Sequence, residues 1–129
     1  IVCHSGLVTM GFNTEVFDQN ADYDGTNTFT APVTGRYLIV TTLYVSGVTS
    51  AANVAAMNIY TSNRTFNFNY GDPIPDDNTE YGFQQTAIVD MDAADTVYIA
   101  LRAYGESSNV WDILGSASAG TSFSAWLLG

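Results

Sequence analysis

Histidine and cysteine are nearly absent from this chain, which contains only Cys3 and His4 of these two types. A single cysteine cannot form a disulfide within the chain, and no cysteine-based zinc site is available. The two residues are neighbours on a predicted strand, where adjacent side chains point to opposite faces. We therefore expect neither a Ser-His-Asp nor a Cys-His catalytic arrangement. No carboxylate pair stands out as suited to glycoside hydrolysis, so the chain is not expected to be an enzyme.

Basic residues are also scarce, with 3 Lys and Arg against 13 Asp and Glu and a formal net charge of -10. Affinity for nucleic acids depends largely on Lys and Arg that neutralise phosphates, so a nucleic-acid partner is excluded. The same reasoning argues against anionic membranes, and no apolar run approaches a membrane span. The acidity favours solubility, divalent cations or cationic partners.

The composition predicts one folded, all-β domain over residues 1–129. Hydrophobic residues make up 47% and aromatic residues 13%, which is enough for a packed core in a chain of 129 residues. Gly, Thr, Ser and Asn are frequent, and no helical periodicity is present. Because the chain begins at Ile1 inside a predicted strand, we expect an upstream region, for example a fibrous stalk.

Alternating apolar residues and turn residues predict the strands. We expect strands at residues 1–11, 28–30, 36–46, 53–61, 65–70, 83–91, 96–104 and 123–128. Loops are expected at residues 71–81 and 105–120, among others. Phe17 and Tyr23, in the turn-rich stretch between the first two strands, are interpreted as core anchors.

Three of these strands, 36–46, 96–104 and 123–128, are apolar on both faces. Since one face of a sandwich sheet normally meets solvent, the second face needs a cover, which a further copy of the chain would supply. We predict that these strands share the inner sheet of a trimer, and that 53–61, 65–70 and 83–91 form a half-exposed outer sheet. The predicted interface residues are Tyr44, Tyr98, Arg102, Tyr104 and Trp126. Alternatively, Tyr and Trp cap the surface of a monomer, and Arg102 reaches into solvent.

Three motifs carry a resemblance to a known family. Residues 29–37 read Phe-Thr-Ala-Pro-Val-Thr-Gly-Arg-Tyr, and residues 121–128 read Thr-Ser-Phe-Ser-Ala-Trp-Leu-Leu. Between them, residues 86–98 place an apolar strand, a short turn and a Val-Tyr strand in succession, with Ala94 where glycine is usual. Together the motifs resemble the globular head of complement component 1q, within the tumour-necrosis-factor-like jelly rolls.

The resemblance implies a ten-stranded antiparallel jelly-roll sandwich that forms a homotrimer and performs no catalysis. Residues 11–24 look most similar to bacterial and bacteriophage members. We therefore expect the head of a virion tail fibre or spike that attaches to a glycan or protein receptor on a host surface. The alternatives are a structural module that trimerises and caps a stalk, and a secreted, extracellular complement-like or cytokine-like binding domain.

The acidic loop at residues 72–80 is a candidate calcium site, although a head domain of this kind is not expected to require a cofactor. Calcium prefers several oxygen ligands, which Asp76, Asp77 and Glu80 could supply. Some members of the family that the chain resembles hold calcium with this loop. The alternative is a solvated loop that two prolines stiffen.

A second candidate site contains Trp111 with Asn109 and Asp112. A tryptophan face beside amide and carboxylate groups can stack on a sugar and hydrogen-bond to it. The alternative is a structural role, with the ring folded over a sheet edge. Asp90, Asp92 and Asp95 surround a predicted turn and are expected to accept backbone hydrogen bonds. Asn63-Arg64-Thr65 fits a glycosylation sequon.

Overall fold

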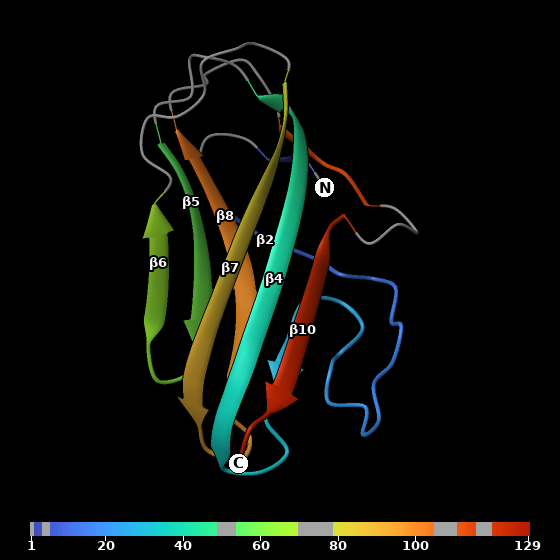
Figure 1. The fold of residues 1–129 in the computed structure, drawn as a ribbon, viewed down its shortest axis with the longest axis vertical. Helices are drawn as coiled ribbons and strands as arrows, with labels where there is room; N and C mark the ends of the chain where they lie inside the picture. Colours follow the sequence, from blue (N-terminus) through green and yellow to red (C-terminus); the bar gives the residue numbers. More distant parts are fainter. Residues whose placement is uncertain (1, 4–5, 49–53, 70–78, 105–110, 116–119) are drawn as a thin grey trace.

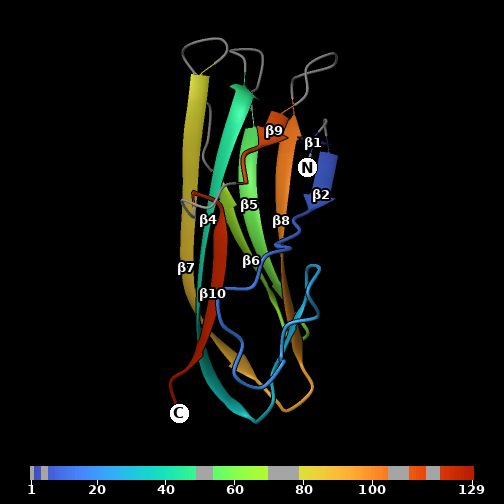
Figure 2. The ribbon, with the colours of Figure 1, turned by 90° about the vertical axis from the view of Figure 1, so that its right-hand side faces the viewer.

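The computed structural model describes residues 2–3, 6–48, 54–69, 79–104, 111–115 and 120–129. These residues form strands joined by turns and irregular segments, and every strand pairing among them is antiparallel. The all-β antiparallel architecture predicted from the sequence is therefore confirmed. Two layers of strands lie face to face (Figures 1 and 2).

One layer, sheet A, is built around the long strand β4 (Gly35–Val48). Strand β7 (Thr79–Met91) pairs with one edge of β4. The other edge is shared, because β10 (Ser122–Leu127) pairs with its first half and β9 (Trp111–Ile113) with its second half. Strand β1 (Val2–Cys3) then pairs with β9.

The other layer, sheet B, has β8 (Thr96–Tyr104) and β5 (Val54–Thr61) at its centre. Strand β6 (Thr65–Asn69) forms the edge beside β5. On the other side of β8 lie β2 (Gly6–Thr9) and β3 (Phe29–Thr30), which pair with different halves of it.

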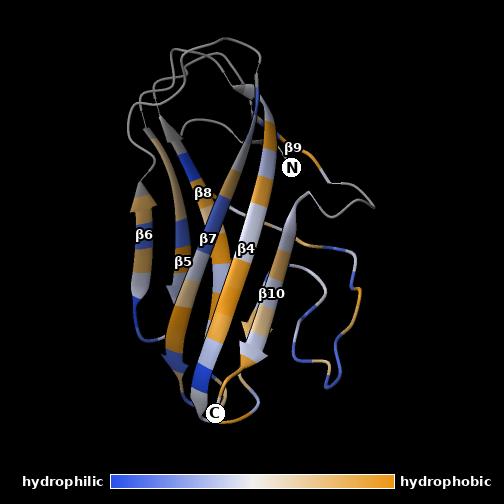
Figure 3. Ribbon diagram, in the orientation of Figure 1, coloured by the Kyte–Doolittle hydropathy of each residue, from blue (hydrophilic) through white to orange (hydrophobic). Residues whose placement is uncertain are grey.

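The core lies between the sheets and consists of alternate residues of each strand. The inward side chains of β4, at Tyr37, Ile39, Thr41, Leu43 and Val45, are 1% exposed or less, while every second residue between them faces outward. Period-two alternation of this kind follows from the pleat of a β-strand. Strand β6 changes between hydrophobic and hydrophilic residues along its length in the same way (Figure 3). The remaining core is formed by Met10, Ala31, Ala55, Met57, Ile59, Phe83, Ala87, Val89, Met91, Val97, Ile99 and Leu101.

The predicted distribution of strands between the sheets is wrong in two places. Strand β8 lies in sheet B, whereas β4 and β10 lie in sheet A. Strand β7, predicted in the outer sheet, is instead the partner of β4 over most of its length. The sequence makes β8 look apolar on both faces because its outward residues include Ala100. Ala100 is buried, although it does not belong to the core between the sheets.

Two further expectations differ from the structure. Residues 1–11 were expected to form one strand but contain β1 and β2, which belong to different sheets. Strand β9 lies inside the expected loop at 105–120. Its three residues are too few to show a repeating pattern in the sequence.

Candidate functional site

The outward face of sheet A carries an apolar row that crosses three strands. Leu38 of β4 is paired with Ile88 of β7 on one side and with Trp126 of β10 on the other. Ile88 is 61% exposed and Trp126 51% exposed, and with Leu38 between them they form a contiguous apolar patch, which is more informative than single exposed side chains. We call Ile88, Leu38 and Trp126 the apolar row.

A segment outside the sheets extends this row. Residues 11–28, which we call the strap, run beside β10 (Figure 1). The ring of Phe17 packs on that of Trp126, with centroids 5.6 Å apart. Phe17 is 64% exposed, so its interpretation as a core anchor is wrong. Tyr23 is half-buried near Phe123, and burial raises the pKa of its hydroxyl.

Above the apolar row, the outward face of sheet A is polar but uncharged. The register places Thr86, Val40 and Ser124 in the next row and Gln84, Thr42 and Ser122 in the one after it. From the row of Leu38 to that of Tyr44, the outward residues of β7, β4 and β10 include no carboxylate and no basic group. Because the chain carries 13 acidic residues, this neutral area is a distinct feature of its surface.

At the upper end of this face, the Tyr44 hydroxyl donates a hydrogen bond to the Glu80 carboxylate. This bond raises the pKa of Tyr44, because it favours the protonated phenol. Glu80 is the only calcium candidate that the structure describes, since Asp76 and Asp77 lie outside the described residues. Within the described parts of the chain, no three acidic, histidine or cysteine side chains gather as metal ligands would.

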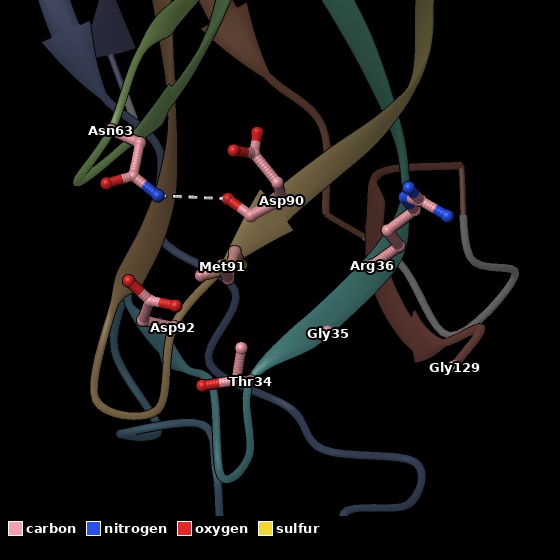
Figure 4. Close-up of a pocket in the computed structure, with 8 residues that line it drawn as sticks. All are labelled: Thr34, Gly35, Arg36, Asn63, Asp90, Met91, Asp92 and Gly129. Carbon is pink, nitrogen blue, oxygen red and sulfur yellow. Dashed lines mark hydrogen bonds between the residues drawn. The ribbon is translucent and has the colours of Figure 1, made fainter.

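At the lower end, charged side chains surround Asp90. The Arg64 guanidinium donates to the Asp90 carboxylate at 2.8 Å and holds its pKa below the ordinary value. Arg36 is the cross-strand partner of Asp90 on β4. A pocket of about 300 Å³ opens here, between Asn63, Thr34 and the Arg36 backbone (Figure 4). In Figure 4 the Arg36 guanidinium points away from the Asn63–Asp90 bond.

The outward face of sheet B is built differently. Tyr60 and Tyr98 stack across β5 and β8 with centroids 5.0 Å apart and an interplanar angle of 12°. Asn58 beside them is only 2% exposed and donates from Nδ2 to the Tyr60 hydroxyl at 3.1 Å. No donor among the described residues reaches its Oδ1 atom.

The five predicted interface residues do not share one face. Tyr44 and Trp126 lie on the outward side of sheet A, whereas Tyr98 and Arg102 lie on the outward side of sheet B. The Tyr104 backbone belongs to β8, and its side chain is outside the described part. The interpretation of a single inner surface is therefore wrong, because β8 is in the other sheet.

The predicted sugar-binding residues are described only in part. Trp111 and Asp112 belong to strand β9, and the Asp112 side chain is exposed. Asn109 and the side chain of Trp111 lie outside the described residues. Alternation along residues 83–91 places Ile88 opposite Ala87 and Val89, which face the core, so its exposure follows from the sequence. Its position beside Leu38 and Trp126, and the exposure of Phe17, do not.

No protein-family model and no curated protein matches this chain. Solved structures do. The globular domain of zebrafish complement 1qA protein is similar with a TM-score of 0.65 and 16% sequence identity, over 94% of this chain and 84% of that one. Eiger TNF from S. frugiperda is similar with a TM-score of 0.54 and 12% identity, over 93% and 83%. The chain thus has the complement 1q and tumour-necrosis-factor-like jelly-roll fold.

Across the described residues, we find no helix with the length and apolar character that crossing a bilayer requires.

Proposed function

We propose that this chain is the homotrimeric, non-enzymatic head domain of a bacteriophage or bacterial fibre or spike, and that it attaches to a host-surface receptor. The observation that carries the trimer is the uncharged outward face of sheet A with its apolar row. The interface proposed here therefore differs from the one predicted from the sequence, which combined β4 and β10 with β8 of the other sheet.

Charge supports self-association through this face. Each copy has a formal net charge of -10, so copies repel one another overall, and a contact face without unpaired carboxylates adds no local repulsion to this. The rows from Leu38 to Tyr44 meet this condition. Covering Ile88 and Trp126 would contribute about 25 cal/mol per Å² of apolar area removed from water. The number of copies follows the trimers of the family that the sequence resembles.

Attachment rests on the fold and on the resemblance of residues 11–24 to bacterial and bacteriophage members. The solved structures that share this fold include a complement domain and a tumour-necrosis-factor protein. The sequence has a single histidine, His4, which gives little support to a Ser-His-Asp arrangement, and no metal-ligand cluster gathers among the described residues. A virion or cell-surface location fits this role.

Sedimentation velocity at micromolar concentration tests the trimer. We expect one species with the mass of three chains of 13.9 kDa. Leu38→Glu should dissociate it, because it places three carboxylates in a shared apolar surface. Thr9→Glu is the matched control, since Thr9 is an exposed residue of β2 on sheet B, away from this face. A wild-type monomer contradicts the proposal.

Receptor attachment is tested separately with the intact trimer. Binding to a printed glycan array or to intact bacterial cells would support it. A stable trimer that binds neither behaves as a stalk cap, and attachment is then wrong.

A further inference from the structure

The edge of the sandwich opposite the strap contains a groove of about 400 Å³. It opens where β6, the edge of sheet B, faces β7, the edge of sheet A. Phe66 of β6 and Ile88, Val89 and Asp90 of β7 line it, together with Arg36 and Arg64. We call it the edge groove.

The edge groove combines apolar surface with positive charge. It contains two of the three basic residues of the chain, and only one carboxylate, that of Asp90, lines it. Asp90 is already paired with Arg64. Arg36 has no ion pair among the described residues, which leaves its charge available to a partner. The groove therefore suits a segment that is apolar and acidic.

The strap has this complementary composition. Residues 13–24 contain four acidic residues and no Lys or Arg. Glu15 and its neighbour Val16 are exposed, Val16 by 86%, and Phe17 by 64%. The carboxylates of Asp18 and Asp24 accept backbone N–H groups of the strap itself. Of the two other acidic residues, Glu15 is exposed and Asp22 is half-buried, so Glu15 is the more accessible to a partner.

The strap and the edge groove lie on opposite sides of one molecule but at the same level along the strands. Figure 1 shows the strap beside β10 and the groove-forming strands β6 and β7 at the other side. The apolar row connects the two, because Ile88 borders the groove and Trp126 contacts Phe17. A rotation axis parallel to the strands preserves this level. Copies related by such an axis place the strap of one against the groove of the next, a head-to-tail contact that closes into a ring of three when each step is a rotation by a third of a turn.

We propose that Val16 and Phe17 of one copy dock in the edge groove of its neighbour, with Glu15 pairing with Arg36 there. The proposal rests on the trimer proposed above and names the contact between its subunits. Its occupant is a second copy of this chain, and no other molecule is required.

Disulfide cross-linking tests the contact directly. In a Cys3→Ser background, we combine Val16→Cys with Ile88→Cys. The two positions lie on opposite edges of one chain, so a bond between them must join two copies. Under oxidation we expect a covalent species of three chains on a non-reducing gel, and none for either single variant. A double variant that stays a single-chain band while sedimenting as a trimer would overturn the contact and leave the trimer intact.

Charge reversal tests the ion pair by sedimentation equilibrium. Glu15→Arg and Arg36→Glu should each raise the dissociation constant of the trimer about tenfold or more, since every substitution acts at three interfaces. The double variant should return it to within about threefold of wild type. Arg102→Glu makes the same charge change on sheet B and should have no effect. Equal effects of Arg36→Glu and Arg102→Glu, or no rescue, would contradict the pairing. A wild-type monomer would instead refute the proposed function as well.

Discussion

The side-chain amide of Asn63 joins the turn between β5 and β6 to Asp95, in the turn between β7 and β8. Its Nδ2 atom donates to the Asp95 carboxylate at 2.9 Å. It also donates to the backbone oxygen of Asp90 at 3.1 Å, the bond drawn in Figure 4. The same Asp95 oxygen accepts from the Asp92 backbone at 2.8 Å. The expected structural role of Asp95 is confirmed by this bond.

Asn63→Ala should lower the free energy of unfolding by about 1–3 kcal/mol, because it removes two hydrogen bonds, one of them to a charged group. Thermal unfolding followed by circular dichroism should show a melting temperature lower by about 3–10 °C. Asn67→Ala, at an exposed position of β6, is the control and should change it little. An equal fall in the control would contradict the assigned role. A glycan on Asn63 should also destabilise the fold, since it replaces one of the two hydrogens.

Ala94 occupies a backbone conformation that favours glycine. Its φ angle is +77°, in the left-handed region that costs an L-residue about 1–2 kcal/mol. The sequence motif has glycine at this position in the family that the chain resembles. Ala94→Gly should therefore raise the free energy of unfolding by up to about 1 kcal/mol, the entropy of the unfolded chain offsetting part of the gain. Urea unfolding of the wild type and the variant measures this difference in the free energy of unfolding.

Ala93→Gly provides the control for this substitution. Ala93 lies in the same turn but does not have a positive φ angle. The change should lower stability by about 0.5–1 kcal/mol, since glycine only adds freedom to the unfolded chain there. If both substitutions change stability in the same direction, strain at Ala94 is not the cause.

The sequence predicts the long strands well because their signal is local. Strand β8 is predicted at residues 96–104 and is found there, since apolar and aromatic residues occupy both of its faces over most of its length. Which strands pair is a non-local property, and periodicity does not contain it. The assignment of β8 and β7 to the wrong sheets follows from this. The prediction that Phe17 anchors the core was wrong for a related reason. An aromatic residue in an irregular segment has no periodicity that would indicate which way its side chain points.

Asn58 is the one buried side chain, among the described residues, with a polar atom lacking a partner. Replacing it by Leu removes the orphan oxygen along with the bond to Tyr60, so the free energy of unfolding should change by less than about 1 kcal/mol. Asn58→Asp keeps the shape but buries a charge at a position 2% exposed. We expect a loss of several kcal/mol at pH 7, part of which returns near pH 4 as the carboxylate is protonated.

Thr41→Val is the comparison for Asn58, because Thr41 is equally buried but its hydroxyl donates to the backbone of Ser122 at 3.1 Å. Losing a satisfied bond should lower the free energy of unfolding by about 1–2 kcal/mol. Guanidinium unfolding at pH 7 measures all three variants. A loss for Asn58→Leu greater than that for Thr41→Val would show that Oδ1 has a partner in solution.

Two carboxylates stabilise the strap and should make it sensitive to acid. Asp24 accepts backbone N–H bonds from Thr28, Thr26 and Asn27, and these bonds hold its pKa below the ordinary value. The pKa of Asp18 is lowered by the N–H groups of Tyr23 and Asp22. A pKa that is lower in the folded state contributes stability above the unfolded pKa and loses it as pH falls through the folded one.

The free energy of unfolding should therefore fall as the pH drops from about 5 towards 2. Asp24→Asn and Asp18→Asn should each flatten this decline, because neither variant has a carboxylate to protonate at that position. Asp112→Asn, on β9 and exposed, is the control and should leave the slope unchanged. In a Trp111→Phe background, tryptophan fluorescence provides a local readout, since Trp126 is then the single tryptophan of the chain and contacts Phe17 of the strap. If the strap detaches first, that signal should change at a higher pH than the circular dichroism of the sheets. Identical pH profiles for wild type and both strap variants would show that these carboxylates do not stabilise the strap.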